Sequence, residues 1–160
     1  MSNEDSMIIG AGGSWKSIDE KPDDAVVKQL TPLSCVAAVG EMLLRSRGIM
    51  VSQRSIIDII DEPSSTAKLA NYLNDVDTSK AVGKWYGSII ERKSIMLLLR
   101  KGPIGVVLRD GEPLGHLVFL PNAEAGRLTI NDPWDGTSYK LSFFEFFRHW
   151  NGEVVFKWNL

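Results

Sequence analysis

Apolar residues in the first half of the chain recur every three to four positions, which is the spacing of amphipathic helices. The pattern begins near Ser34 and ends with Arg45, Arg47 and Gly48, a basic last turn followed by a glycine cap. Three further segments have helical spacing: SQRSIIDIIDE from Ser52, SSTAKLANYLND from Ser64, and ERKSIMLLLRKG ending at Gly102. Four helices are therefore predicted before residue 103.

After Gly102 the helical spacing gives way to short apolar runs separated by Gly, Pro, Asn and Asp. Such runs are typical of β-strands joined by tight turns. Strands are expected over residues 103–110, 115–122, 126–132, 137–142 and 152–160, with one helix over 141–150. Helices followed by an antiparallel sheet form the α+β pattern, which is the predicted fold class.

Length and composition are those of one globular domain, with 160 residues, 44% hydrophobic and 24% charged. Residues 1–24 are polar and Gly-rich, so a flexible N-terminal segment is expected there and the domain is expected over 25–160. The pair Gly12-Gly13 before Ser14 is interpreted as part of a flexible tail, with self-processing as the alternative.

Charge and hydropathy exclude two classes of partner. The net charge is −2 and no block of Lys and Arg is present, so nucleic acid is not expected as a partner. The apolar run Ile95–Leu99 is far too short to span a bilayer, so membrane insertion is not expected. The acidic N-terminus does not resemble a secretory signal peptide, which predicts a cytoplasmic protein or one exported without a classical signal.

The single cysteine, Cys35, lies just after Ser34 at the predicted start of the first helix. One interpretation is a buried packing residue, since free cysteine is among the most buried residue types. The other is a nucleophile, because the N–H groups and dipole of a helix N-terminus stabilise a thiolate. A lone cysteine forms no internal disulfide, so the thiol is available for chemistry.

A nucleophilic thiolate needs an imidazole partner, and the chain has two histidines. His116 begins an apolar strand after a glycine, whereas His149 is interpreted as a surface or capping residue near a helix end. The imidazole in turn needs an acceptor, and the segment NDPWD on the next strand offers Asn131, Asp132 and Asp135. Pairing Leu120 with Leu128 would place residue 116 opposite residue 132, which favours Asp132.

Gln29 precedes Cys35 by six residues, across a turn that contains Pro32. Its amide N–H₂ group is a candidate donor to an oxyanion formed beside the Cys35 backbone N–H. Taken alone, a glutamine at this spacing is a weak signal.

Together, Q-x5-C before a helix, a distant G-H on an apolar strand, and N-D-P-x-x-G resemble a papain-like cysteine peptidase. The chain is most similar to bacteriocin leader peptidases, the domains in front of peptide-exporting ABC transporters, and their stand-alone relatives. The resemblance extends from about residue 25 and includes a G-P-I strand and S-F-x-E-F-x-x-x-W over residues 142–150.

The resemblance implies a papain-like α+β fold with the active site between a helical half and a sheet half. It implies that Cys35 is the nucleophile, His116 the base, Asp132 the orienting acid and Gln29 the oxyanion donor, with a peptide or protein as substrate. The family usually has glycine directly after the nucleophile, where this chain has Val36.

Two other functions remain open for the same residues. Papain-like folds also occur in bacterial effectors or toxins that deamidate glutamine or transfer acyl groups, in which case an inhibitor or immunity protein would be a partner. A non-catalytic domain that only binds peptides is the third possibility. No cofactor is expected, because position 15 is Trp where a dinucleotide-binding G-x-G-x-x-G would need glycine, and one Cys with two distant His forms no metal-binding spacing.

Overall fold

The computed structural model describes residues 15–78, 83–110 and 115–159 of the chain. In chain order its elements are β1 (Ile18–Pro22), α1 (Cys35–Arg45), α2 (Gln53–Ile60), α3 (Thr66–Val76), β2 (Lys84–Ile89), the 3-10 turn η2 (Arg92–Ser94), α4 (Ile95–Leu99), β3 (Ile104–Leu108), β4 (His116–Leu120), β5 (Ala123–Glu124), β6 (Arg127–Asp132), β7 (Thr137–Ser142), α5 (Phe143–His149) and β8 (Trp150–Trp158).

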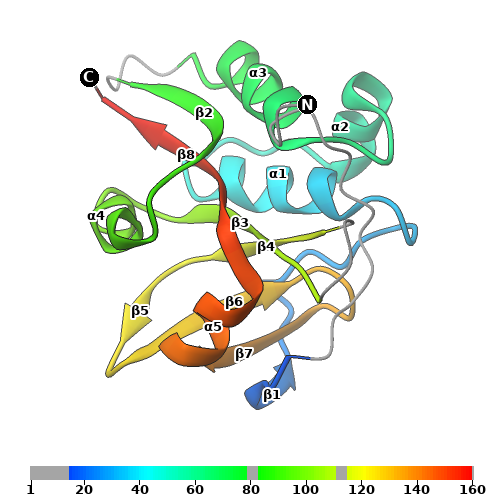
Figure 1. Ribbon diagram of the computed structural model, residues 1–160. Helices are drawn as coiled ribbons and strands as arrows, with labels where there is room; N and C mark the ends of the chain where they lie inside the picture. Colours follow the sequence, from blue (N-terminus) through cyan, green and yellow to red (C-terminus); the bar gives the residue numbers. More distant parts are fainter. Residues whose placement is uncertain (1–14, 79–82, 111–114, 160) are drawn as a thin grey trace.

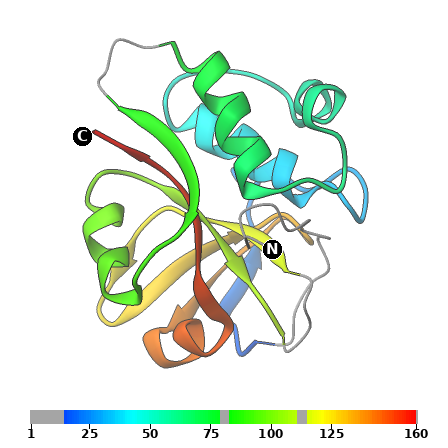
Figure 2. The ribbon, with the colours of Figure 1, turned by 45° about the horizontal axis from the view of Figure 1, so that its top comes forward.

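One antiparallel sheet forms the second half of the molecule. Its strands are ordered β1-β7-β6-β4-β3-β8-β2, and the short β5 pairs with β6. Helices α1, α2 and α3 gather at one side of this sheet, while α5 and α4 lie beside its other parts (Figure 1). The predicted division into a helical half and an antiparallel half is confirmed, and Figure 2 shows it from a second direction.

Two apolar clusters, one on each side of β4, hold the halves together. Leu117 and Phe119 face the cluster that surrounds α1, whereas Val118 and Leu120 face the cluster inside the strongly curved sheet. This alternation is the period-2 pattern of a strand whose two faces are both buried. His116 starts the same strand on the side of Val118, so its position follows from the alternation.

The N-terminal part of the described chain is more ordered than the sequence predicts. Trp15 is buried and β1 pairs with β7, although residues 1–24 were expected to form a flexible segment. Apart from Ile18, β1 is exposed at the edge of the sheet, so it carries no alternating apolar pattern that would reveal a strand. Residues 1–14, with Gly12 and Gly13, lie outside the described residues.

The strand β2 was also missed, because Gly87 interrupts the apolar pattern of KWYGSI. The same glycine sets the distance between β2 and α3. A Cβ atom at position 87 would overlap the backbone carbonyl of Thr66 at the start of α3. Since that obstacle is backbone rather than the end of a flexible side chain, it cannot move aside without shifting the helix.

Replacing Gly87 with alanine is therefore expected to destabilise the fold by about 2 kcal/mol or more, as for other overpacked positions. Urea unfolding followed by circular dichroism measures this loss. The neighbouring Ser88→Ala is the matched control, because it alters a side chain on the same strand without adding atoms. Equal stability of the two variants would show that α3 and β2 tolerate a wider separation.

Candidate active site

Cys35 is the first residue of α1, and its side chain is fully buried. As the first helical residue, its backbone N–H has no carbonyl of the same helix to bind, so it points out of the helix end. A buried cysteine can be either a packing residue or a nucleophile. The groups around the sulfur atom decide between these two roles.

The loop that leads into α1 is held by Gln53, a buried residue at the start of α2. Gln53 Nε2 donates to the Lys28 carbonyl at 2.7 Å, and its Oε1 accepts from the Leu30 N–H and the Ser34 hydroxyl, both at 3.1 Å. Ser34, at the N-cap position of α1, makes no side-chain capping bond to the helix, because its hydroxyl is used in this loop. Sequence reasoning missed Gln53, since a single glutamine at a helix start carries no distinguishing pattern.

His116 and Asp132 are in contact across β4 and β6. His116 Nε2 lies 2.6 Å from Asp132 Oδ1, and both side chains are buried. The contact is present as predicted, but the register behind that prediction is wrong. Phe119 pairs with Asn131, so residue 132 faces residue 118 and is a diagonal neighbour of residue 116 on the same face.

Asp132 accepts three hydrogen bonds. Oδ1 accepts from His116 and from the Trp134 backbone N–H at 2.9 Å, while Oδ2 accepts from the Tyr139 hydroxyl at 2.7 Å. Burial alone would raise the pKa of this carboxyl, but the hydrogen bond and charge of His116 and the other two donors outweigh burial and lower it. Asp132 is therefore an ionised acceptor.

The imidazole of His116 is held in its protonated form. Burial alone would lower the pKa of His116, but Asp132 and then Cys35 act in the opposite direction and raise it to about 10. Because Nε2 is occupied by Asp132, the nitrogen that faces Cys35 is Nδ1, which has no well-directed hydrogen bond among the described residues. A loosely aligned Cys-His pair is common in substrate-free sites. This arrangement suits an ion pair of thiolate and imidazolium.

Two aromatic residues enclose the imidazole. The Trp15 ring stacks on it with a centroid distance of 6.2 Å and an interplanar angle of 16°. Trp134 meets the same ring edge-on at 6.5 Å. Trp134 is 37% exposed, as expected for a wall of a cleft, whereas Trp85 is a core residue bonded to Asp77.

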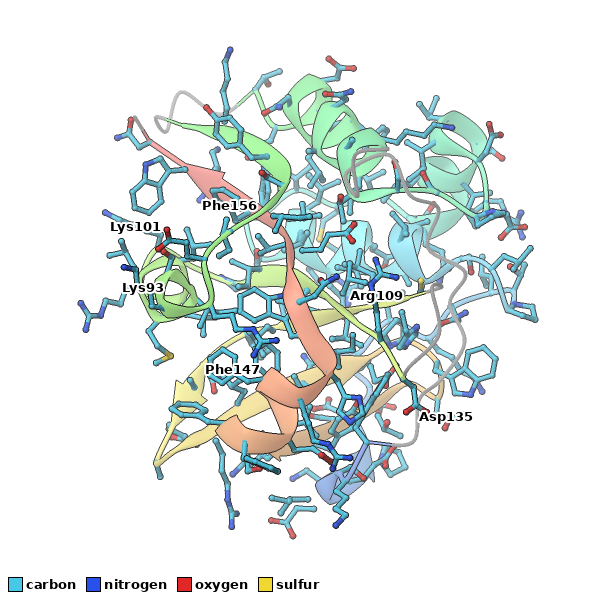
Figure 3. The ribbon with its side chains drawn as sticks, viewed as in Figure 1. Lys93, Lys101, Arg109, Asp135, Phe147 and Phe156 are labelled. Carbon is cyan, nitrogen blue, oxygen red and sulfur yellow. The ribbon has the colours of Figure 1, made fainter. Side chains whose placement is uncertain are left out.

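Gln29 lies beside this centre and connects the two halves. Its backbone N–H donates to the Pro133 carbonyl at 2.8 Å, and its side-chain Nε2 donates to the Thr31 carbonyl at 2.8 Å. A pocket of about 270 Å³ opens here, lined by residues 28–32, Trp134 and Asp135. In Figure 1 the start of α1, the start of β4 and the β6–β7 turn meet on the right, and Figure 3 labels Asp135 on that side.

The other predicted residues have structural surroundings. His149 Nδ1 lies 2.8 Å from the Arg109 carbonyl, and its ring contacts Trp15 rather than Cys35. Gly115 precedes His116 and lies close to β3. A Cβ at this position would overlap Val107 and approach Arg109, so the missing side chain serves packing against β3.

Neither a metal site nor a membrane-spanning helix is found in the described part of the chain. Across residues 15–78, 83–110 and 115–159, no three His, Cys, Asp or Glu side chains are grouped as metal ligands. None of the helices within these ranges has the length and hydropathy needed to cross a bilayer.

Replacing Asp132 with asparagine is expected to lower the rate of any Cys35-dependent reaction by roughly 100-fold, because the amide can present N–H to the imidazole and select the wrong tautomer. Rates of thiol alkylation and of peptide cleavage both measure this effect. Asn131→Ala and Asp135→Ala are the controls from the same segment, and changes of less than about threefold in the alkylation rate are expected for them. A larger loss in Asn131→Ala than in Asp132→Asn would reassign the acceptor.

Comparisons with known proteins find similarity in sequence and in fold. No protein-family model matches the chain. Over 150 residues, or 92% of its length, the chain is 40% identical to Cysteine protease effector 1 of Escherichia coli. The match covers 30% of that relative, so the chain spans about a third of the relative's length.

Two solved peptidase domains have similar structures. The peptidase domain of Streptococcus ComA, a bi-functional ABC transporter involved in a quorum sensing pathway, gives a TM-score of 0.66 at 18% identity, covering 84% of this chain and 97% of that one. A double glycine motif protease from an AMS/PCAT transporter, solved with its leader peptide, gives 0.68 at 19% identity, covering 92% and 95%. The fold is that of these peptidase domains, which confirms the predicted resemblance and the papain-like α+β class.

Proposed function

We propose that this chain is a cysteine peptidase in which Cys35 attacks a peptide carbonyl and forms a thioester. The observation that carries the proposal is the pair of His116 contacts, with Asp132 at 2.6 Å on Nε2 and Cys35 on the side of Nδ1. An inert core thiol has no need of a buried imidazole that is held protonated by a carboxylate. The effector named as a cysteine protease and the two peptidase domains support the same activity.

The reaction begins with the thiolate of Cys35 attacking the carbonyl carbon. The oxyanion that forms accepts hydrogen bonds from the Cys35 N–H and from Gln29 Nε2, an amide nitrogen with two N–H groups of which one binds Thr31. The His116 imidazolium then protonates the leaving amine, and the C–N bond breaks to give the thioester. In the second step His116 takes a proton from water, which hydrolyses the thioester and frees Cys35.

Asp132 keeps its charge throughout these steps. By accepting the Nε2 hydrogen it leaves Nδ1 as the nitrogen that exchanges protons with sulfur, leaving amine and water. Because Cys35 is fully buried, a substrate reaches the sulfur only when neighbouring groups separate. The pocket beside Gln29 and Trp134 is the opening through which we expect the substrate to enter.

For the substrate we propose a peptide segment with two consecutive glycines before the cleaved bond, as in the double glycine motif that names one structural neighbour. Incubation with a peptide containing Leu-Gly-Gly-Ser is expected to cleave the Gly-Ser bond. One product fragment then ends with Gly-Gly and the other begins with Ser. The matched peptide with both glycines replaced by alanine is expected to be cleaved at least about 10-fold more slowly, since side chains at those positions need extra space. Mass spectrometry of the products measures both rates.

A second incubation, with a Gln-containing peptide and an added amine, separates the peptidase from the alternative enzymes. A glutamine deamidase would leave a Gln-containing peptide intact in length and change its mass only by the exchange of the amide for an acid. An acyltransferase would join the acyl fragment to an added amine. Either product, in place of two fragments, would overturn the peptidase while leaving Cys35 as the nucleophile.

A further inference from the structure

Behind Asp132 lies a chain of two buried hydrogen bonds that the reaction scheme does not use. Tyr139 on β7 contacts Asp132 Oδ2 at 2.7 Å, and Trp15 Nε1 contacts the Tyr139 hydroxyl at 2.7 Å. Tyr139 is 3% exposed and Trp15 is 8% exposed. Sequence reasoning placed neither residue in the site.

The chemistry of the groups fixes which is donor and which is acceptor in both of these hydrogen bonds. An indole N–H can only donate, so the Tyr139 oxygen accepts from Trp15 and its single hydrogen points to Asp132. Asp132 Oδ2 is then an acceptor, and Oδ1 already accepts the Trp134 N–H. These donors, together with His116, lower the pKa of the carboxyl, so Asp132 is ionised. Consequently the nitrogen of His116 that faces it carries a hydrogen, and the other nitrogen is presented to Cys35.

We infer that Tyr139 and Trp15 are positioning residues that fix the ionisation of Asp132 and, through it, the tautomer and orientation of His116. Trp15 acts twice, because its N–H orients the Tyr139 hydroxyl and its ring covers one face of the imidazole. Their role rests on the proposed function, since without a reactive Cys35 there is no proton to direct. It also makes the active site depend on residues that precede the predicted domain boundary.

The segment that carries Trp15 is anchored on both sides. The neighbouring Lys16 backbone N–H donates to Glu145 of α5 at 2.9 Å, and the Trp15 ring meets His149 edge-on at 5.6 Å. From there the chain continues into β1, which pairs with β7, the strand that carries Tyr139. Trp15 and Tyr139 therefore come from paired segments, and their relative position is set by the sheet.

Among the residues that the structure describes, few charged groups act on these two hydrogen bonds. His116 and Cys35 act on it from β4 and α1, and Glu20 on β1 acts on Tyr139. Burial and then the charge of Asp132 raise the pKa of Tyr139, so the phenol keeps its hydrogen from acidic to mildly alkaline pH. The donation from Tyr139 to Asp132 is one of the contacts that lower the pKa of the carboxyl. Loss of the hydroxyl should therefore allow Asp132 to take up a proton at a higher pH.

The experiment measures the rate of Cys35 alkylation by iodoacetamide from acidic to mildly alkaline pH in the full chain. In Tyr139→Phe the midpoint of the acidic fall in rate is expected to move to higher pH, with a roughly 10-fold lower rate at neutral pH, as for loss of a charge-assisted hydrogen bond. Trp15→Phe keeps a ring against His116 but lacks the N–H. It is expected to shift in the same direction with a loss of roughly threefold.

Tyr86→Phe is the matched control, because Tyr86 stacks on Phe156, which Figure 3 labels on the side away from Asp135. It should match the wild type in rate and midpoint. A folded Tyr139→Phe with an unchanged midpoint, whether or not its rate falls, would overturn the inference, because a packing role alone does not move that midpoint. If Tyr139→Phe does not fold, an unchanged midpoint in Trp15→Phe would overturn it equally. Slow alkylation of the wild type itself would instead overturn the proposed function and, with it, any such role for Tyr139.

Discussion

Replacing Cys35 with alanine is expected to reduce peptide cleavage to the uncatalysed background while changing the free energy of unfolding by no more than about 1 kcal/mol. The thiol is the group that forms the thioester, and no second cysteine exists in the chain to replace it. The stability changes little because alanine fits the buried start of α1 without a polar atom or added volume. Cleavage of the double-glycine peptide and urea unfolding measure the two quantities.

Cleavage alone does not identify a thiolate, so the wild type should also be labelled with iodoacetamide at about pH 6, where an ordinary thiol is less than about 1% ionised. Fast labelling, complete within minutes under conditions where a free cysteine reacts only slightly, is expected. Since Cys35 is fully buried, the rate also contains the opening of the site. Retained cleavage in Cys35→Ala would remove Cys35 from the mechanism altogether.

The helical and strand spacing of the sequence was sufficient to predict the helices α1, α2 and α3 and the central strands β3, β4, β6 and β7. These elements have at least one buried face, so burial leaves a period in their sequences. The strand β1 is an exposed edge and β2 is interrupted by Gly87, so neither leaves such a period. Both strands are specified by their partners β7 and β8 in the folded chain.

The contact between His116 and Asp132 was predictable because both side chains lie on one face of adjacent strands. Side chains alternate between the two faces of a strand, so a residue's face depends only on whether its position is odd or even. The predicted pairing placed residue 132 opposite residue 116 instead of residue 118, an error of two positions that left the face unchanged. The exact register was not predictable, since the hairpin after β4 includes the short β5, whose pairing with β6 is offset by one residue from the pairing of β4 with β6. A spacing argument does not detect Trp15 or Gln53, because their contacts join residues more than 20 positions apart. It does not detect Tyr139 either, because a single tyrosine on a strand has no distinguishing pattern.

Replacing His116 with alanine is expected to lower the alkylation rate of Cys35 at about pH 6 by roughly 100-fold, because the imidazolium that stabilises the thiolate is lost. His149→Ala is the matched control, since the second histidine contacts the Arg109 carbonyl and Trp15 instead of the sulfur. It should retain alkylation within about threefold of the wild type.

The pH dependence of the wild type gives the same assignment a second test. The pKa of His116 in the folded protein, about 10, lies above its ordinary value of 6.5, so the imidazolium is retained across neutral pH and is lost only as the pH rises through about 10. Between pH 6 and 8 the wild-type alkylation rate should therefore rise by less than about threefold, whereas in His116→Ala it should rise roughly 100-fold, as the rate of an ordinary thiol does. A steep rise in the wild type, or loss of fast labelling in His149→Ala alone, would show that His116 is not the partner of Cys35.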